Sequence, residues 1–178
     1  MWAWLGFDPP IERQRARALA GAAAQASRTP ALYGPKRVDD TFSGRFEMAA
    51  LHAILLMRRI AAEPDGRRLA QAVSNRVFSS FDEALREVGE GDLSVAKRMK
   101  SLARAFYGRL QAYETGLATA DEAALAAALA RNVWNLDTAP FAPKLATYAV
   151  ALDRALAGTP LAELGDGRPW PQTAASTL

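Results

Sequence analysis

The stretch MAALHAILLM, Met48 to Met57, decides the fold class. It carries no charge, and it lies inside a longer segment, Arg45 to Ala62, that is apolar on nearly every side. A helix that is hydrophobic all round is buried on several faces, and the uncharged run is about half of the roughly 20 residues that span a bilayer. We therefore expect this segment to form the buried central helix of a helical domain that does not cross a membrane.

The rest of the chain repeats apolar residues at the 3.6-residue period of amphipathic helices, and no segment alternates long enough to predict a strand. Thr119 and Glu122 fit a capping box, and Asp92 or Ser94 fits the cap of the preceding helix. The pattern predicts an all-α fold, a single compact domain of about six helices around the central one. The outer helices are expected at residues 8–28, 65–88, 92–117, 119–134 and 143–156.

The chain divides into three stretches. Residues 1–28, an N-terminal segment and helix, are expected to pack as one domain with the helical region at 29–164. At the start of that region, residues 29–44 are rich in Pro, Gly and Asp, which predicts a long ordered loop or a functional excursion of the chain. Residues 165–178 are expected to form a polar C-terminal tail.

Composition excludes several classes of site. The 178 residues include no cysteine and one histidine, His52, so thiolate metal sites, multi-histidine sites and Ser-His-Asp triads are excluded. Since His52 lies in the most apolar segment, we expect a hydrogen-bonded core residue rather than a catalytic base. Asp39 and Asp40 lack the third acid of an Asp-Asp-x-x-Asp metal motif, because Ser43 takes its place, so we interpret them as turn residues. The sequence therefore predicts no enzyme, no metal and no cofactor.

The N-terminus and the net charge bear on partners and location. A formal charge of +3 does not demand a nucleic-acid partner, and we expect no DNA binding. The opening stretch MWAWLGFDPP has no basic segment and no small-residue cleavage site, which argues against a secretory signal. Its aromatic residues Trp2, Trp4 and Phe7 have two interpretations: they pack onto the core, or they anchor the protein peripherally among lipid headgroups.

The segment GDLSVAKRMKSLARAFYGR, Gly91 to Arg109, holds five positive charges and a single acid. At about 100° per residue, Lys97, Lys100 and Arg104 fall within about 60° of one another and away from the apolar stripe of the helix. We assign a partner-binding surface to this face and its borders. The surface comprises Lys97, Lys100, Arg104, Tyr107, Gln111, Arg98 and Arg109.

A structural role for the arginines is the alternative. Arg98 and Arg109 lie at nearly the same angle and border the apolar stripe, so their aliphatic stems can pack on the core. Helices joined by a short turn pack antiparallel, and the end of the preceding helix is acidic. Ion pairs of these arginines are therefore expected with acids of that stretch: Asp82, Glu83, Glu87, Glu90 and Asp92. Pairing of Arg98 and Arg109 would be compatible with a free Lys97 face.

Four segments resemble the ubiquinol-cytochrome c chaperone family. Residues 91–113, GDLSVAKRMKSLARAFYGRLQAY, are similar to its signature helix, which typically starts G-D-L-S-V and ends A-F-Y-G-R. The others are DTFSGRFEMAALHAILLMRRI at 40–60, VFSSFDEALREVGEGD at 77–92 and LARNVW at 129–134. Together the resemblance extends from Pro30 to Leu156.

The resemblance implies a non-enzymatic assembly factor for respiratory complex III, the ubiquinol-cytochrome c reductase. Its implied partners are newly made cytochrome b or a complex III assembly intermediate, with the ribosome and the inner membrane as further contacts. Because no transit peptide is evident, the chain resembles a bacterial member, expected in the cytoplasm or peripherally on the inner membrane. A eukaryotic member would be mitochondrial.

Two other classes of function stay open on the sequence. A ribosome- or RNA-associated helical module would set Lys97, Lys100 and Arg104 against phosphates, which predicts steep salt dependence. An enzyme acting on an isoprenoid-like substrate inside a helical bundle would need acids that the sequence does not supply.

Overall fold

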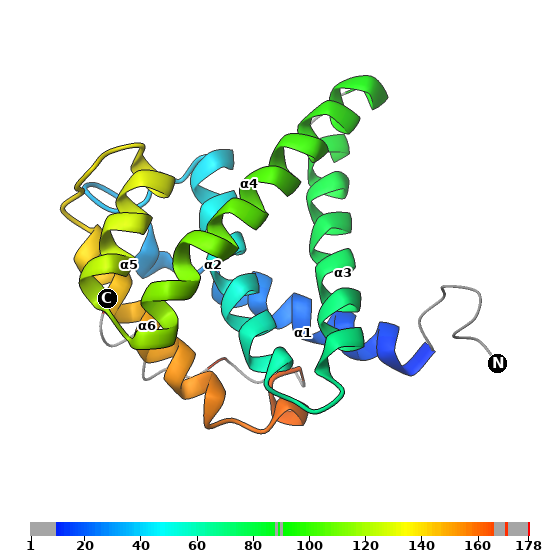
Figure 1. Ribbon diagram of the computed structural model, residues 1–178. Helices are drawn as coiled ribbons and strands as arrows, with labels where there is room; N and C mark the ends of the chain where they lie inside the picture. Colours follow the sequence, from blue (N-terminus) through cyan, green and yellow to red (C-terminus); the bar gives the residue numbers. More distant parts are fainter. Residues whose placement is uncertain (1–9, 88, 90, 166–169, 171–177) are drawn as a thin grey trace.

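The computed structural model describes residues 10–87, 89, 91–165, 170 and 178. Over these residues the chain forms six α-helices, three short helical turns and no β-strand, which confirms the predicted all-α fold (Figure 1). The α-helices are α1 (Pro10–Ala26), α2 (Phe42–Ala61), α3 (Gly66–Glu87), α4 (Asp92–Thr119), α5 (Glu122–Leu129) and α6 (Ala142–Ala157). The turns are η2 (Pro30–Leu32), the π-helical η3 (Ala130–Trp134) and η4 (Leu161–Glu163).

Helix α2 lies at the centre, as the sequence predicts. Most of its side chains are buried, and it packs against α1, α3, α4 and α6. The helix starts at Phe42, earlier than the expected start at Arg45, because the hydroxyl of Thr41 accepts a hydrogen bond from the Gly44 amide at 3.2 Å and caps the helix. The loop expected at 29–44 is correspondingly shorter.

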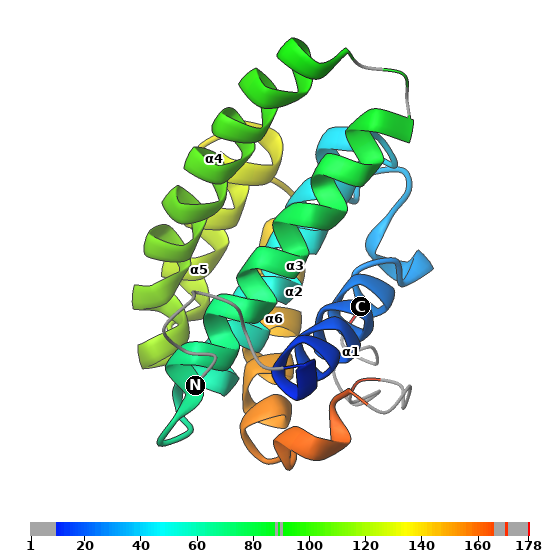
Figure 2. The ribbon, with the colours of Figure 1, turned by 90° about the vertical axis from the view of Figure 1, so that its right-hand side faces the viewer.

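The helices form two groups that share α2. Helices α1, α2 and α3 pack on one another, while α4, α5 and α6 pack as a second set that meets α2 through α6 and part of α4. Figure 1 shows α3 and α4 meeting near the turn that joins them and diverging further along, while in Figure 2 the two helices run alongside each other. The N-terminal half of α4 therefore extends beyond the second group, beside the C-terminal end of α3 (Figure 1).

Two expected caps differ in the structure. Helix α4 is preceded by Gly91, and neither Asp92 nor Ser94 supplies a side-chain cap. Thr119 belongs to the last turn of α4, which ends because Ala120 adopts a left-handed conformation with φ of 53°. Asp121 then caps α5 by accepting a hydrogen bond from a backbone amide at 3.0 Å, so the capping box predicted at Thr119 is wrong.

The C-terminal stretch contributes to the core. Residues 165–178, expected as a polar tail, include Trp170, whose buried ring lies 6.0 Å from the His52 ring. The last residue, Leu178, also packs against the core. Among the helices that the structure describes, none combines the length and the apolar character that a membrane span requires.

Candidate partner-binding surface

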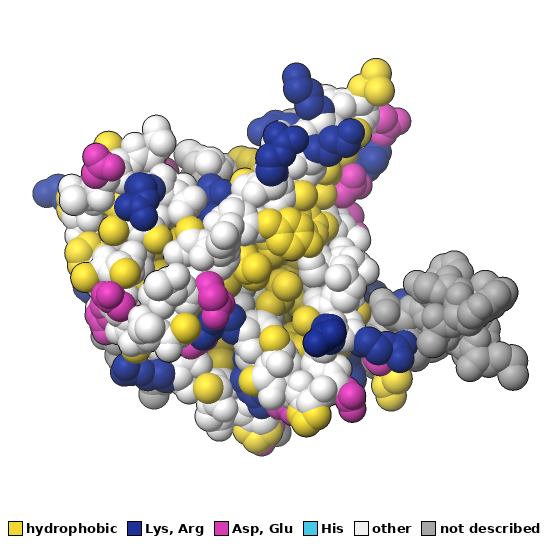
Figure 3. Space-filling view, in the orientation of Figure 1, with side chains coloured by type: hydrophobic (Ala, Val, Ile, Leu, Met, Phe, Trp, Pro, Cys, Tyr) yellow, Lys and Arg dark blue, Asp and Glu magenta, His cyan; other side chains and the backbone are white. Residues whose placement is uncertain are grey.

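The cations assigned from the sequence lie on an open face of α4. The side chains of Lys97, Lys100 and Arg104 are exposed, as are Tyr107 and Gln111. None of the three cations forms an ion pair within the described part of the chain. Figure 3 shows Lys and Arg side chains gathered over the N-terminal half of α4. The predicted exposure is thus observed, while the role of these residues in binding stays a prediction.

Arg109 has a structural position instead. Its guanidinium forms a bidentate ion pair with the buried carboxylate of Glu47 on α2, and it also donates to the Ala105 carbonyl at 2.9 Å. The same group lies 5.4 Å from the centre of the Phe46 ring. Burial raises the pKa of Glu47, and the Arg109 charge opposes that rise. The expected pairing of Arg109 with acids of α3 is therefore wrong, because a carboxylate of α2 lies under it.

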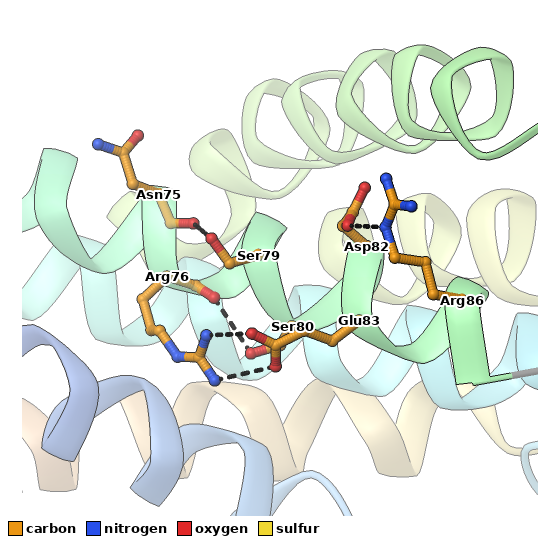
Figure 4. A network of polar contacts seen from close by, with 7 residues as sticks. All are labelled: Asn75, Arg76, Ser79, Ser80, Asp82, Glu83 and Arg86. Carbon is orange, nitrogen blue, oxygen red and sulfur yellow. Dashed lines mark hydrogen bonds and ion pairs between the residues drawn. The ribbon is translucent and has the colours of Figure 1, made fainter. Parts of the chain in front are cut away.

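Three of the expected acids, Asp82, Glu83 and Asp92, are bound by arginines of α3, and Figure 4 shows the pairs of Asp82 and Glu83. Glu87, the last residue of α3, forms no ion pair among the described residues. Arg76 makes two hydrogen bonds to Glu83, of 2.7 and 3.1 Å. Arg86 binds Asp82 at 2.7 Å and also pairs with Asp92 at the start of α4. These three acids therefore have cationic partners without using the Lys97 face of α4.

Arg98 is exposed and also contacts α2. Its guanidinium lies 5.2 Å from the centre of the Phe42 ring, within range of a cation–π interaction. Glu90, one of its expected partners, is outside the described residues. We accordingly treat Arg98 and Arg109 as residues that position α4, and Lys97, Lys100 and Arg104 as its free cations.

An aromatic cluster, which the sequence analysis did not single out, lies next to the free cations. Phe78 of α3 contacts both Phe106 and Tyr107 of α4, with ring centres 5.4 and 6.2 Å apart. Phe106 is fully buried, whereas Tyr107 is 51% exposed, so the cluster extends from the core to the surface. Figure 3 shows hydrophobic side chains gathered on the surface between α3 and α4. Phe78 was missed because it lies beside, and not within, the apolar stripe of α3.

His52 belongs to the core, as predicted. Its ring is fully buried, with Nδ1 2.7 Å from the Met48 carbonyl oxygen and Nε2 2.7 Å from the Tyr148 hydroxyl. Burial lowers the pKa of His52 to about 4, so the ring is neutral at physiological pH. A neutral ring can donate to the carbonyl through Nδ1 and accept from the tyrosine through Nε2.

The other polar candidates also have structural roles. Asp40 binds Arg45 through two hydrogen bonds of 2.6 and 3.1 Å. Over the described residues, no three His, Cys, Asp or Glu side chains come together as metal ligands. A cavity of about 460 Å³ between α5 and α6 is lined mainly by alanines, and Glu122 at its edge accepts a hydrogen bond from Thr147. Trp2, Trp4 and Phe7, proposed for membrane contact, lie outside the described residues.

Comparison with known proteins gives concordant results. Residues 36–173 match the sequence profile of a family described as ubiquinol-cytochrome c chaperone. The crystal structure of the Cbp3 homolog from Brucella abortus matches with a TM-score of 0.75 and 36% sequence identity, over 88% of this chain and 88% of that chain. A comparison with curated proteins found no match.

Proposed function

Since the chain belongs to the ubiquinol-cytochrome c chaperone family, we propose that it assists assembly of respiratory complex III by binding newly made cytochrome b. The observation that carries the proposal is the family match over residues 36–173, together with the likeness to the Cbp3 homolog. Membership of a chaperone family agrees with the prediction of a non-enzymatic protein. The action proposed is therefore binding of a client and not chemistry on it.

The surface of α4 supports a binding role. Exposed aromatic residues are enriched where proteins bind one another, and Tyr107 is half exposed at the end of an aromatic cluster. Beside it, Lys97, Lys100 and Arg104 carry charge that no described acid neutralises. A newly made membrane protein exposes apolar segments to water before insertion, and an apolar surface can cover such segments. We assign client binding to this face.

The proposed site of action follows from the client. A bacterial member of the family would act in the cytoplasm, or peripherally on the inner membrane where its client is inserted. Trp2, Trp4 and Phe7 are proposed as the membrane contacts, because tryptophan favours the headgroup boundary. A eukaryotic member would act in mitochondria.

The test combines gene deletion with crosslinking in the native organism. Deletion should lower cytochrome b and assembled complex III while transcripts of the cytochrome genes stay unchanged. A photoreactive residue in place of Tyr107 should crosslink to cytochrome b, and one in place of the exposed residue Lys144, on α6, serves as the control. Normal complex III in a strain without any other family member would overturn the proposal.

Ribosome or RNA binding is a second candidate, favoured by the same unpaired cations. Contacts to phosphates release counterions, so affinity would fall steeply as salt rises. Binding of purified ribosomes at increasing salt concentrations, compared between the parent and the variant K97E/K100E/R104E, tests this candidate. Binding that is independent of salt and of the three charges would exclude it.

A further inference from the structure

The free face of α4 combines charge and apolar surface in one row. At about 100° and 1.5 Å per residue, Leu93, Lys97, Lys100, Arg104 and Tyr107 lie within a sector of about 80° and along about 21 Å of the helix. Leu93 is 91% exposed at one end of the row, and Tyr107 is 51% exposed at the other. The row thus presents an apolar residue at each end and three cations between them.

The Tyr107 end of the row is held in place by the core. Phe106, the next residue along the helix, is fully buried, and its ring lies 5.8 Å from that of Tyr107. Phe78 packs against both rings from α3. An aromatic side chain fixed in this way loses little conformational entropy when a partner covers it. Tyr107 is therefore suited to anchor an apolar residue of a partner.

The three cations give the row a positive charge. The nearby acids Asp82, Glu83 and Asp92 are bound by Arg76 and Arg86. Glu87, the other described acid at this end of α3, forms no ion pair with the row. Opposite charges across an interface steer association, and like charges brought together oppose it. A segment with Asp or Glu beside its apolar residues would be favoured, whereas one with Lys or Arg there would be repelled.

A preference for acidic flanks would distinguish between the flanks of membrane-spanning helices. Lys and Arg accumulate in the short cytoplasmic loops of membrane proteins and are depleted on the opposite side. A basic surface would therefore avoid the cytoplasmic flanks of membrane-spanning helices. It would accept apolar segments whose flanks are acidic or neutral.

Resting on the proposed function, we propose that the row from Leu93 to Tyr107 binds apolar client segments with acidic flanks and rejects those with basic flanks. Tyr107 contributes affinity through apolar contact. Lys97, Lys100 and Arg104 make binding of acidic flanks more favourable than binding of basic flanks. The two contributions come from different side chains, so they can be separated by substitution.

The test uses the full chain and fluorescent synthetic peptides that share one apolar helical core of about 20 residues, the length of a membrane span. The flanks are Glu, Gln or Lys, and binding is followed by fluorescence anisotropy. The Glu-flanked peptide should bind at least about tenfold more tightly than the Lys-flanked peptide. K97E/K100E/R104E should invert this order, while Tyr107→Ser should weaken every peptide and keep the order.

A matched control is R13E/R15E/K144E, which changes the net charge equally at exposed cations away from the row. It should retain the preference of the parent for Glu flanks. Equal binding of the Glu- and Lys-flanked peptides, or the same loss in both triple variants, would overturn the proposed selectivity.

Other classes of partner are tested with the same proteins. If vesicles of anionic lipid or an RNA oligonucleotide bind through Lys97, Lys100 and Arg104 while no peptide binds, the assignment to a peptide segment is wrong. The deletion strain provides an independent readout, because normal complex III there would contradict the proposed function without altering the peptide preference. Failure of the inference and failure of the function are therefore distinguishable.

Discussion

The C-terminal half of α4 is held from several sides, whereas the N-terminal half is largely exposed. In the C-terminal half, Arg109 pairs with Glu47 of α2, Tyr113 is fully buried, and Gly116 lies directly against Leu125 of α5. The N-terminal half, from Asp92 to about residue 105, has Val95 as its one fully buried side chain among the described residues. One continuous helix thus serves as an anchor at one end and as a display surface at the other.

The difference between the two halves of α4 predicts which substitutions change stability and which change binding. A side chain that is packed and hydrogen-bonded on several sides contributes to the free energy of unfolding, whereas exposed charges contribute little. Substitutions at the packed positions of the C-terminal half, such as Arg109, Tyr113 and Gly116, should therefore affect folding first. Substitutions in the N-terminal half should affect partners first. The predictions below test this contrast, beginning with the largest expected effect.

The ion pair between Arg109 and Glu47 should give the largest effect. Arg109→Ala leaves a buried carboxylate without its partner, which costs about 3–5 kcal/mol in comparable cases. The urea midpoint of unfolding, compared with that of Lys100→Ala as an exposed control, measures the loss. Replacing the pair together, as Arg109→Met with Glu47→Leu, should recover part of it because no buried charge remains. Equal midpoints for Arg109→Ala and Lys100→Ala would contradict the contrast.

The core around α2 should lose stability in acid through His52. The pKa of His52 is about 4 in the folded protein and about 6.5 in an unfolded chain, so the unfolded state binds more protons between these values. The stabilisation is therefore complete above about pH 6.5 and is lost as the pH falls toward 4, by about 3 kcal/mol in total.

The thermal midpoint, measured between pH 7 and pH 4, tests this expectation. His52→Gln should be less stable at neutral pH and should show a smaller decrease on acidification. Glu47, whose pKa is raised by burial, contributes in the opposite direction, so the difference between variant and parent isolates the histidine. An identical pH dependence of the two proteins would mean that His52 does not titrate in this way.

Two glycines of α4 allow a matched comparison of a packed and an open position on the same helix. A Cβ at Gly116 would lie 2.9 Å from the Leu125 Cβ and 3.0 Å from its backbone nitrogen, whereas a Cβ at Gly108 would meet nothing within 4 Å. Gly116→Ala should therefore destabilise by about 1–3 kcal/mol through overpacking. Gly108→Ala should stabilise by up to about 1 kcal/mol, because alanine is the better helix former. Denaturant unfolding should give shifts of opposite sign, and shifts of the same sign would show that both positions are equally constrained.

The helices and the central position of α2 could be predicted because they depend on local patterns. The apolar run at residues 48–57 and the stripe of α6, including Leu145 and Leu152, are buried as their spacing indicates. Caps were less predictable, since Thr119 and Asp121 both fit the local pattern. The left-handed conformation of Ala120 decides between them, and it depends on how α4 and α5 pack.

The candidate surface was only partly predictable. Exposure of Lys97, Lys100 and Arg104 follows from angles on a single helix. The partner of Arg109 does not, because Glu47 is 62 residues away along the chain. The contact of Phe78 with Tyr107 likewise depends on how α3 and α4 cross. Sequence periodicity thus identifies which side chains of a helix point away from the protein core. Tertiary packing determines which of these side chains contact other helices.

The smallest effect on stability is expected for K97E/K100E/R104E, which changes the exposed N-terminal half of α4. No described acid pairs with these cations, so the variant loses no ion pair, and exposed charges contribute little to stability. The free energy of unfolding should stay within about 0.5 kcal/mol of the parent, which a urea titration can resolve against Arg109→Ala. If the reversal destabilises the protein as strongly as Arg109→Ala does, the N-terminal half of α4 is itself part of the folded core. Its charges would then be needed to hold that half against α3, and they could not be assigned to a partner.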